Sequence, residues 1–446
     1  MSSWSEIPDI ELPGKIVTKA LEMGADDVIC TLMTSNVKQV RFANNSITAS
    51  KFWAQKVAGI FLVKERRVVA TDISDFSTTD DTLQDLLNMS KVMEESQNYK
   101  GLAGGSFDYR PSAPDQRIPQ LLDELYGYVD DAISSALDAG AKRVAGVLYT
   151  SAGNQYLCSS TGPSGDYSSA DIEISIRAMA ANEGSGHMVQ SVVNLDDFDP
   201  GTAGKEAGEL AARSQNPAIG EEGKFDVLFS PMPFANILER VASSSSAGYV
   251  DAGFSFLKDM VGKDVASPVV SLADDGTHAS SLNTPPFDSE GVPTRRTPII
   301  ENGKLKGYLH NTSTAKQFGT ETTGNAGLVF PYSWSVHLAP GDQGKEELIS
   351  QVKDGYYVTN VWYTRFQNYQ TGDFSTIPRD AIFRIKDGRI VGSVKDIRIS
   401  ENMVDLMRKV KAVGNDVKQI HWWEVTTPVF TPHVLVEGVN ITKSTQ

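Results

Sequence analysis

The chain has 446 residues and a formal net charge of −15, because 41 lysines and arginines face 56 aspartates and glutamates. This length exceeds what one hydrophobic core normally organises, so we expect two or three domains. The acidic balance argues against nonspecific binding to nucleic acid, which needs a basic face. No apolar run is long enough to span a membrane, no secretory leader pattern opens the chain, and two cysteines cannot form a disulfide framework. We therefore expect a cytoplasmic protein with no membrane or nucleic-acid partner.

The first hundred residues predict a helix followed by an antiparallel meander. Apolar residues at helical spacing precede Gly24, the expected end of the first helix. Asn44-Asn45 is typical of a hairpin turn, and residues 79–95 predict an amphipathic helix. The stretch 99–119 is rich in Gly, Pro and Ser and is expected to be a long connection. The predicted strands are 27–33, 37–42, 47–53, 57–63 and 67–71.

One segment of this region is repeated. Residues 20–35 read ALEMGADDVICTLMTS and residues 136–151 read ALDAGAKRVAGVLYTS, with eight of sixteen positions identical at an offset of 116. The favoured interpretation is an internal duplication of a helix, a glycine stop and a strand. It predicts a pseudo-symmetric N-terminal domain in which matching helices pack on an antiparallel sheet. The alternative is that unrelated helix–glycine–strand junctions look alike.

The second half of the chain predicts mostly antiparallel strands with a few packed helices. We place the domain boundary near residues 217–223, giving an N-terminal domain over 1–217 and a C-terminal domain over 223–446. The fold class is therefore α+β, with a duplicated helix–strand–hairpin unit in the first domain. The predicted C-terminal elements are a strand at 225–229, a helix at 231–243 capped by Ser230, a hairpin at 297–300 and 305–310 with an Asn302-Gly303 turn, a helix from Asn311 to Phe318 stopped by Gly319, a strand at 356–363, a hairpin at 381–385 and 389–394 around Asp387-Gly388, a helix from Ser400 to Gly414 and a strand at 433–441. A short helix is also expected at 205–213, before the boundary.

An ordered set of motifs runs through the second half. Residues 287–319 read FDSEGVPTRRTPIIENGKLKGYLHNTSTAKQFG, TGNAG follows at 323–327, and TGDFS and VGND follow at 371–375 and 413–416. This set resembles the core signature of the TldD/PmbA family of peptidases. Its spacing resembles the TldE (PmbA) branch more than the TldD branch.

The resemblance directs attention to the helix at 231–243. In the TldD branch the matching helix carries His-Glu-x-x-x-His, in which two histidines bind zinc and the glutamate acts as a base on metal-bound water. Here these positions are Leu238, Glu239 and Ser243. Leucine cannot bind zinc, and a neutral serine hydroxyl is a poor zinc ligand. The resemblance therefore implies a chain with a vestigial motif, no catalytic residue, no metal and no cofactor of its own, and we expect Glu239 to be a solvated or ion-paired carboxylate.

No other pattern predicts a catalytic centre. The six histidines are scattered, and none lies three to five residues from another, the spacing that zinc-binding helices use. A nucleophile elbow, a phosphate-binding loop and a dinucleotide fingerprint are all absent from the sequence. Asp288 and Glu290 lie close in sequence to Arg295 and Arg296. These four charges form either a rim that orients a peptide or, as the favoured interpretation, ion pairs within one loop.

A binding surface for extended peptides is the remaining prediction. Exposed strand edges and glycine-rich loops can accept a peptide as an added strand through main-chain hydrogen bonds. His310 lies at the end of the signature hairpin and is the histidine expected to face a cleft. Ordinary turn chemistry is the alternative for the loop residues. The candidate groove residues are His310, Asn311, Gly324, Asn325, Thr371, Gly372 and Asp373.

The resemblance implies a non-catalytic, substrate-holding subunit that pairs with a TldD-like catalytic subunit, on which the zinc is expected. Such a pair would mature or degrade unfolded peptides held as extended strands, and the chain alone could form a homodimer. Whether this chain is itself an enzyme stays open. One alternative is a stand-alone hydrolase with a metal site assembled from dispersed Asp, Glu and His. Another is a non-enzymatic binding or regulatory protein, in line with the family's older description as a modulator of DNA gyrase.

Overall fold

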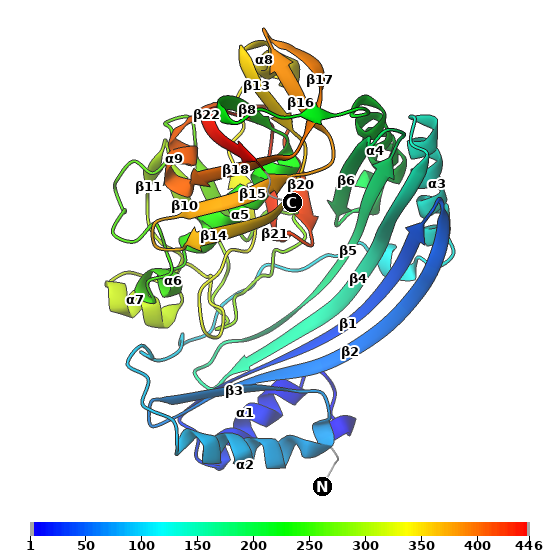
Figure 1. The fold of residues 1–446 in the computed structure, drawn as a ribbon. Helices are drawn as coiled ribbons and strands as arrows, with labels where there is room; N and C mark the ends of the chain where they lie inside the picture. Colours follow the sequence, from blue (N-terminus) through cyan, green and yellow to red (C-terminus); the bar gives the residue numbers. More distant parts are fainter. Residues whose placement is uncertain (1–3, 444–446) are drawn as a thin grey trace.

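The computed structural model describes residues 4–443 and has the expected α+β class, with one sheet in the N-terminal half and two in the C-terminal half. Figure 1 shows the long strands of the first sheet curving past one side of the C-terminal half. Among residues 4–443, none of the helices combines the length and apolar character that crossing a membrane requires.

The N-terminal sheet has six antiparallel strands in the order β3-β2-β1-β4-β5-β6. Its strands are β1 (Asp27–Ala43), β2 (Ser46–Lys64), β3 (Arg67–Ile73), β4 (Arg143–Ser159), β5 (Ser164–Met179) and β6 (Ser185–Val192). Its helices are α1 (Leu12–Glu22), α2 (Thr79–Ser90), α3 (Glu124–Asp138) and α4 (Pro200–Arg213).

The two halves of this sheet have the same order of helices and strands. The order α1-β1-β2-β3-α2 recurs as α3-β4-β5-β6-α4, and β1 pairs with β4 in the middle. Asn36 lies opposite Ala152, the position 116 residues later, so a pseudo-twofold axis passes between them. Side chains on one face of β1 pack with α1 and α2 near one end of the strand and with α3 and α4 near the other. Both helix pairs therefore lie on the same face of the sheet, at its opposite ends (Figure 1). The structure thus has the internal pseudo-symmetry that the repeated segment predicts.

The central strands are longer than predicted. The strands expected at 27–33 and 37–42 are one strand of 17 residues, β1, and those expected at 47–53 and 57–63 are one of 19 residues, β2. Their middle residues are partly exposed, so apolar alternation fails there although backbone pairing continues without a break. Two helix limits also differ. Helix α2 ends at Ser90, and α4 begins at Pro200 because Asp199 caps it by accepting from the Thr202 amide.

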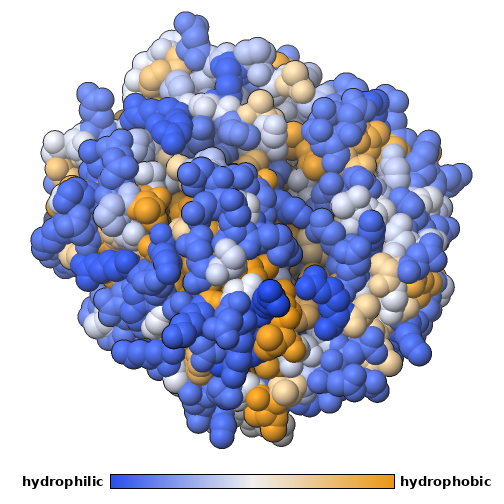
Figure 2. Space-filling view, turned by 90° about the horizontal axis from the view of Figure 1, so that it is seen from above, coloured by the Kyte–Doolittle hydropathy of each residue, from blue (hydrophilic) through white to orange (hydrophobic). Residues whose placement is uncertain are grey.

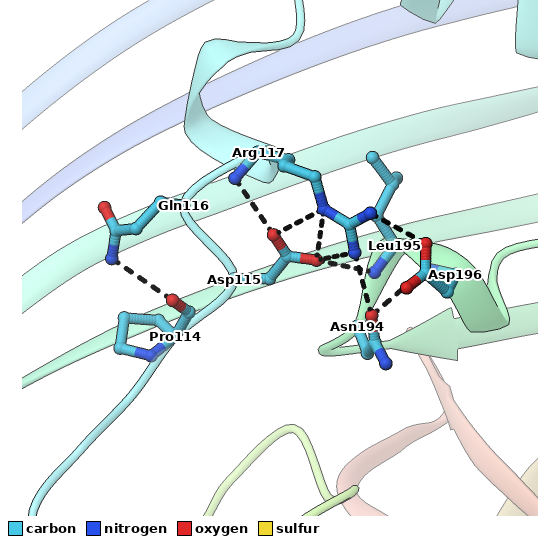
Figure 3. A network of polar contacts seen from close by, with 7 residues as sticks. All are labelled: Pro114, Asp115, Gln116, Arg117, Asn194, Leu195 and Asp196. Atoms are coloured by element: carbon cyan, nitrogen blue, oxygen red, sulfur yellow. Dashed lines mark hydrogen bonds and ion pairs between the residues drawn. The ribbon is translucent and has the colours of Figure 1, made fainter.

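The connection before α3 has almost no regular structure, as predicted, but it is tied to the protein. Figure 3 shows the Arg117 guanidinium between the carboxylates of Asp115 and Asp196 at 2.7 Å from each. The Asp115 carboxylate also accepts from the Leu195 amide at 3.0 Å. Hydrogen bonding to Arg117 holds the pKa of Asp115 well below its usual range. The end of this connection is therefore anchored to the turn between β6 and α4.

The C-terminal half contains a ten-stranded and a six-stranded sheet, mostly antiparallel, with parallel pairs at β8–β13, β7–β17 and β12–β21. The larger sheet runs β14-β15-β18-β22-β8-β13-β16-β17-β7, with β19 paired to β22. Its strands are β7 (Ala218–Ile219), β8 (Gly223–Phe229), β13 (Asp354–Val358), β14 (Val361–Asn368), β15 (Asp373–Pro378), β16 (Ile382–Lys386), β17 (Arg389–Lys395), β18 (Ile397–Asn402), β19 (Val410–Val413) and β22 (Val434–Lys443).

The smaller sheet runs β11-β10-β9-β12-β21-β20. Its strands are β9 (Leu272–Asp275), β10 (Arg296–Glu301), β11 (Lys304–Leu305), β12 (Val336–Leu338), β20 (Lys418–Trp422) and β21 (Val425–Thr431). The helices of this half are α5 (Pro231–Ser244), α6 (Ala247–Asp251), α7 (Thr312–Phe318), α8 (Lys345–Ser350) and α9 (Met403–Arg408). The predicted boundary at 217–223 falls between α4 and β8, where β7 already pairs with β17.

Local turn signals are confirmed, whereas several strand limits are wrong. Asn302 and Gly303 have φ of 49° and 82°, and Gly319 ends α7 with φ of 66°. The strand expected at 305–310 shrinks to β11, and the one expected at 356–363 divides into β13 and β14. The helix expected from Ser400 is α9, which Asn402 caps, and its predicted last turn is β19. In this half, strands β7, β9, β12, β15, β18, β20 and β21 were not predicted.

Close packing of α3 and α4 requires glycine at one face of α4. A Cβ atom added to Gly204 would lie 2.1 Å from the Ala132 carbonyl oxygen. We expect Gly204→Ala to lower the free energy of unfolding by about 1–3 kcal/mol, because a backbone contact cannot move away as a flexible side chain can. Gly127→Ala in α3 is the matched control, since nothing lies within 4 Å of its added Cβ. Higher helix propensity should make it neutral or stabilising by up to about 1 kcal/mol. Urea unfolding of both variants checks the pair, and equal effects would contradict the packing argument.

Candidate functional site

Helix α5, which carries the positions matching the zinc motif, is the central helix of the C-terminal half. Twelve of its 14 residues are buried, and it packs in one core with residues of both C-terminal sheets. Pro231 occupies its first turn, where a missing amide hydrogen costs nothing. Ser230 stands at the N-cap position, but its hydroxyl donates to the Thr359 carbonyl at 2.9 Å and caps no helix amide. Ser230 is therefore the N-cap residue, as predicted, but its hydroxyl joins α5 to the sheet and does not cap a helix amide.

The three motif positions are used for structure. Leu238 is fully buried in the core, Ser243 is partly buried, and Glu239 is only 5% exposed. Glu239 Oε1 accepts from the amides of Thr426 and Thr427, each at 2.8 Å, and from the Thr426 hydroxyl at 3.1 Å. The expectation of a solvated or ion-paired Glu239 is therefore wrong. A carboxylate on a helix enclosed by two sheets cannot reach water, so it is stabilised by donors from the start of β21.

These positions do not fit a zinc ion. Leu238 has no donor atom, and one oxygen of Glu239 already accepts three hydrogen bonds. Within residues 4–443, no group of three or more His, Cys, Asp or Glu side chains is arranged to hold a metal ion.

An exposed strand edge lies beside α5. Strand β14 is the end strand of the larger sheet, and Tyr363 interrupts its pairing with a φ of 58°. The Tyr363 amide donates to Glu424 Oε1 at 3.2 Å, which joins this edge to the turn between β20 and β21. Rings along this edge are well exposed: Tyr363 by 46%, Tyr369 by 54% and Trp423 by 56%. We refer to β14 together with these three rings as the β14 edge.

Figure 2 shows that the face of the molecule seen from above is mainly hydrophilic, with hydrophobic residues in a narrow band from its centre toward its lower edge and in smaller scattered patches. Such a distribution leaves few apolar surfaces on which a ligand could dock on this face.

The predicted groove residues at the signature helix are buried. His310 is 5% exposed and packs against the rings of Tyr308 and Phe318. Burial lowers the pKa of His310 to about 4, so its ring is neutral at pH 7. Asn311 caps α7 by accepting from the Thr314 amide at 2.8 Å. His310 therefore contributes to the core and does not face an open cleft.

The glycine-rich loop after α7 is also enclosed. Asn325 is fully buried, and its amide donates to Asp274 Oδ2 at 2.5 Å and to the Tyr332 carbonyl at 2.9 Å. Gly324 has a φ of 71°, and a Cβ there would lie 2.5 Å from the Pro293 carbonyl oxygen. These residues hold the loop in place, so neither lines an open groove.

The third predicted segment lies in the turn between β14 and β15. Thr371 and Asp373 are exposed, and the Thr371 hydroxyl donates to Asp373 Oδ2 at 2.6 Å. Gly372 is buried with a φ of 82°. Asn402, the cap of α9, donates to the Thr371 carbonyl at 2.6 Å. The structure therefore does not bring the seven predicted residues together in one groove.

The four charges near the start of the signature neither form a rim nor pair with one another. Asp288 is fully buried and accepts from the amides of Glu290, Val292 and Ala326, each at 2.9 Å. Burial, with a smaller effect of the Glu290 charge, raises the pKa of Asp288 to about 7. Arg296 instead lies 3.7 Å from Asp275. The favoured interpretation, ion pairs within the loop, is therefore wrong, because backbone amides take the place of the arginines.

Arg110, from the connection before α3, was not predicted to matter. Its guanidinium donates to the carbonyl oxygens of Thr284 and Pro285 at 2.9 and 2.6 Å and to the Thr294 hydroxyl at 2.9 Å. Tyr109 beside it donates to the Gly291 carbonyl at 2.7 Å. An arginine in a Pro- and Ser-rich loop gives no sequence signal for this role.

Buried polar contacts also join the two halves. His187 of β6 lies between the Ser175 hydroxyl, at 2.9 Å from Nε2, and the Asn360 amide, at 3.1 Å from Nδ1. The same Asn360 amide donates to Asp380, which Arg177 contacts at 2.7 Å. These residues have no shared sequence spacing that could have predicted the contact.

The central domain of the PmbA/TldA metallopeptidase model matches residues 109–215, and its C-terminal domain matches residues 222–443. The chain belongs to the PmbA/TldD family. A metalloprotease of Methanothermobacter thermautotrophicus is 30% identical over 232 residues, 50% of each chain. The metalloprotease PmbA of Escherichia coli O157:H7 is 28% identical over 200 residues, 44% of this chain and 43% of that protein. The aligned part of this chain spans about half the length of the curated relatives it matches.

Solved structures match over nearly the whole chain. A Thermotoga maritima protein described as a modulator of a DNA gyrase has a TM-score of 0.84 and 26% identity, covering 96% of this chain and 99% of that one. TldE from Thermococcus kodakarensis has a TM-score of 0.85 and 20% identity, with the same coverage. These neighbours confirm the predicted fold class.

The Glu239 contacts predict a difference between two substitutions. Glu239→Ala should lower the free energy of unfolding by about 3 kcal/mol, because the amides of Thr426 and Thr427 lose their buried acceptor. Glu239→Gln retains an acceptor oxygen and should cost about 1 kcal/mol or less. Chemical unfolding measures both, and equal losses would show that the hydrogen bonds do not stabilise this position.

His187 predicts a pH dependence. Burial lowers its pKa from 6.5 to about 4, so the unfolded chain binds a proton that the folded chain does not. The contribution of His187 to the free energy of unfolding should therefore fall by up to about 3 kcal/mol as the pH drops from 6.5 toward 4. In His187→Gln the pH profile should be flatter over this range, although the variant is less stable at pH 7. Unfolding titrations at several pH values test this, and parallel profiles would contradict it.

Proposed function

We propose that this chain is the non-catalytic, substrate-holding subunit of a TldD/TldE-type zinc metallopeptidase that processes or degrades unfolded peptides in the cytoplasm. The proposal rests on the residues of α5 that occupy the zinc-motif positions. A leucine in the core and a carboxylate committed to three hydrogen bonds stand where the TldD branch carries zinc ligands and a base. Without a metal, nothing here lowers the pKa of water toward neutrality.

The β14 edge supports the substrate-holding role. An end strand leaves backbone N–H and C=O groups unpaired on one side, and an extended peptide can pair with them whatever its sequence. The exposed rings of Tyr363, Tyr369 and Trp423 add apolar area beside that edge. The β14 edge lies at the protein surface, so a partner subunit that packs beside this edge would find the peptide at its own active site.

The proposal assigns zinc and the catalytic base to a TldD-like partner and no cofactor to this chain. Family membership and the TldE-like fold support this pairing. His310, Gly324 and Asn325 are buried, so the peptide is assigned to the β14 edge and not to a groove lined by these three residues.

Co-expression with the TldD-like chain of the same genome should give a stable complex in which zinc and peptidase activity appear together. Elemental analysis and a peptide-cleavage assay should show no zinc and no cleavage with this chain alone, and both with the complex. Glu239→Gln in this chain should leave activity unchanged, whereas the same change at the partner's motif glutamate should abolish it. Stoichiometric zinc with chelator-sensitive activity in this chain alone, or failure of the partner to associate, would overturn the proposal.

A further inference from the structure

A cavity of about 400 Å³ lies where the two halves of the chain meet, away from α5 and the β14 edge. Its volume is within the range of about 300–1,000 Å³ that is usual for ligand pockets. Ile29, Phe61 and Leu102 of the N-terminal half form an apolar wall, and Leu328 and Phe330 of the C-terminal half also line the cavity. Of the signature residues predicted to bind peptide, only Asn311 lines this cavity.

The charged groups of this cavity are all acidic. Glu94, Asp251 and Glu290 line it, and no lysine, arginine or histidine does. Within residues 4–443, none of these three carboxylates forms an ion pair. The nearby Lys316 acts electrostatically on Glu290, but its ammonium group donates to the Lys100 carbonyl at 2.9 Å.

Two of these carboxylates, the exposed Asp251 and the buried Glu290, accept hydrogen bonds from neutral donors. Asp251 accepts from the amide of Asn98 at 3.2 Å and from that of Gln317 at 2.6 Å. Glu290 is 5% exposed, and its Oε2 accepts from the Thr312 amide at 3.2 Å. Hydrogen bonds from neutral groups fix these side chains without placing a positive charge in contact with them.

We propose that this cavity binds the amino-terminal end of a peptide, with the α-ammonium group at the carboxylates of Glu290 and Asp251 and an apolar first side chain against the wall. The carboxylates favour a cationic ligand through charge complementarity. The apolar wall favours a ligand in which a hydrophobic group lies next to that cation. A free amino terminus with an apolar first residue carries both in one residue. The inference rests on the proposed function only in taking a peptide as the ligand, and it adds a substrate class: peptides with free, apolar amino termini.

Isothermal titration calorimetry of the full chain without any partner tests this site. The probe is the peptide Leu-Phe-Gly-Ser-Gly-amide, compared with its N-acetylated form. The free peptide should bind at least about tenfold more tightly, since acetylation removes a charge-assisted hydrogen bond. Glu290→Gln and Asp251→Asn should each weaken binding of the free peptide by about tenfold and leave the acetylated peptide unaffected.

Phe330→Ala should weaken both peptides, and it is a safe variant because Phe330 is 40% exposed. Asp264→Asn is the matched control, since Asp264 is an exposed carboxylate that pairs with Lys304 and does not line the cavity. Unfolding curves of all variants show that they fold. Equal binding of the two peptides, unchanged binding by Glu290→Gln, or preference for an acetylated peptide with an internal lysine would each overturn the proposal. Because the assay needs no catalytic partner, its failure is distinct from failure to form a complex.

Discussion

The enclosure of α5 between two sheets is the constraint on which the C-terminal half depends. A helix with 12 of 14 residues buried has no solvent face, so each polar side chain on it needs a partner inside the protein. Glu239 finds that partner in the backbone at the start of β21, and Ser230 finds it at Thr359. The same enclosure explains why Leu238 is well tolerated where a metal ligand would stand in the TldD branch. A hydrophobic residue at this depth fills the core without any demand for hydrogen bonds.

Several polar residues of the signature segment stabilise the fold. Asp288, Asn311 and Asn325 each satisfy backbone or buried polar groups of neighbouring loops. Arg110 and Tyr109 then fasten the connection before α3 to the same segment. These hydrogen bonds connect the two halves of the chain, and the acidic cavity lies beside them. A segment that carries a family signature can thus define the shape of a site while few of its residues contact a ligand.

Local signals in the sequence predicted local structure well. The Asn302-Gly303 turn and the Gly319 helix stop followed from the need for positive φ, which few residues tolerate. The repeated segment predicted the pseudo-twofold sheet, because two equal units can share one antiparallel centre. Strand lengths were less predictable. The middles of β1 and β2 lack apolar alternation, but their backbone pairing with neighbouring strands continues there.

The sequence by itself determined the family, the α+β class, the internal repeat and the absence of zinc-binding residues at the motif, since each depends on residue identity and order. Only the tertiary structure decided the environment of those residues. Glu239 changed from an expected surface carboxylate to a buried acceptor, and Asn325 from a groove residue to a core residue, because burial depends on which elements pack together. The acidic cavity also depends on the tertiary structure. Phe61, Asp251 and Glu290 lie far apart along the chain, and only folding brings them to one place.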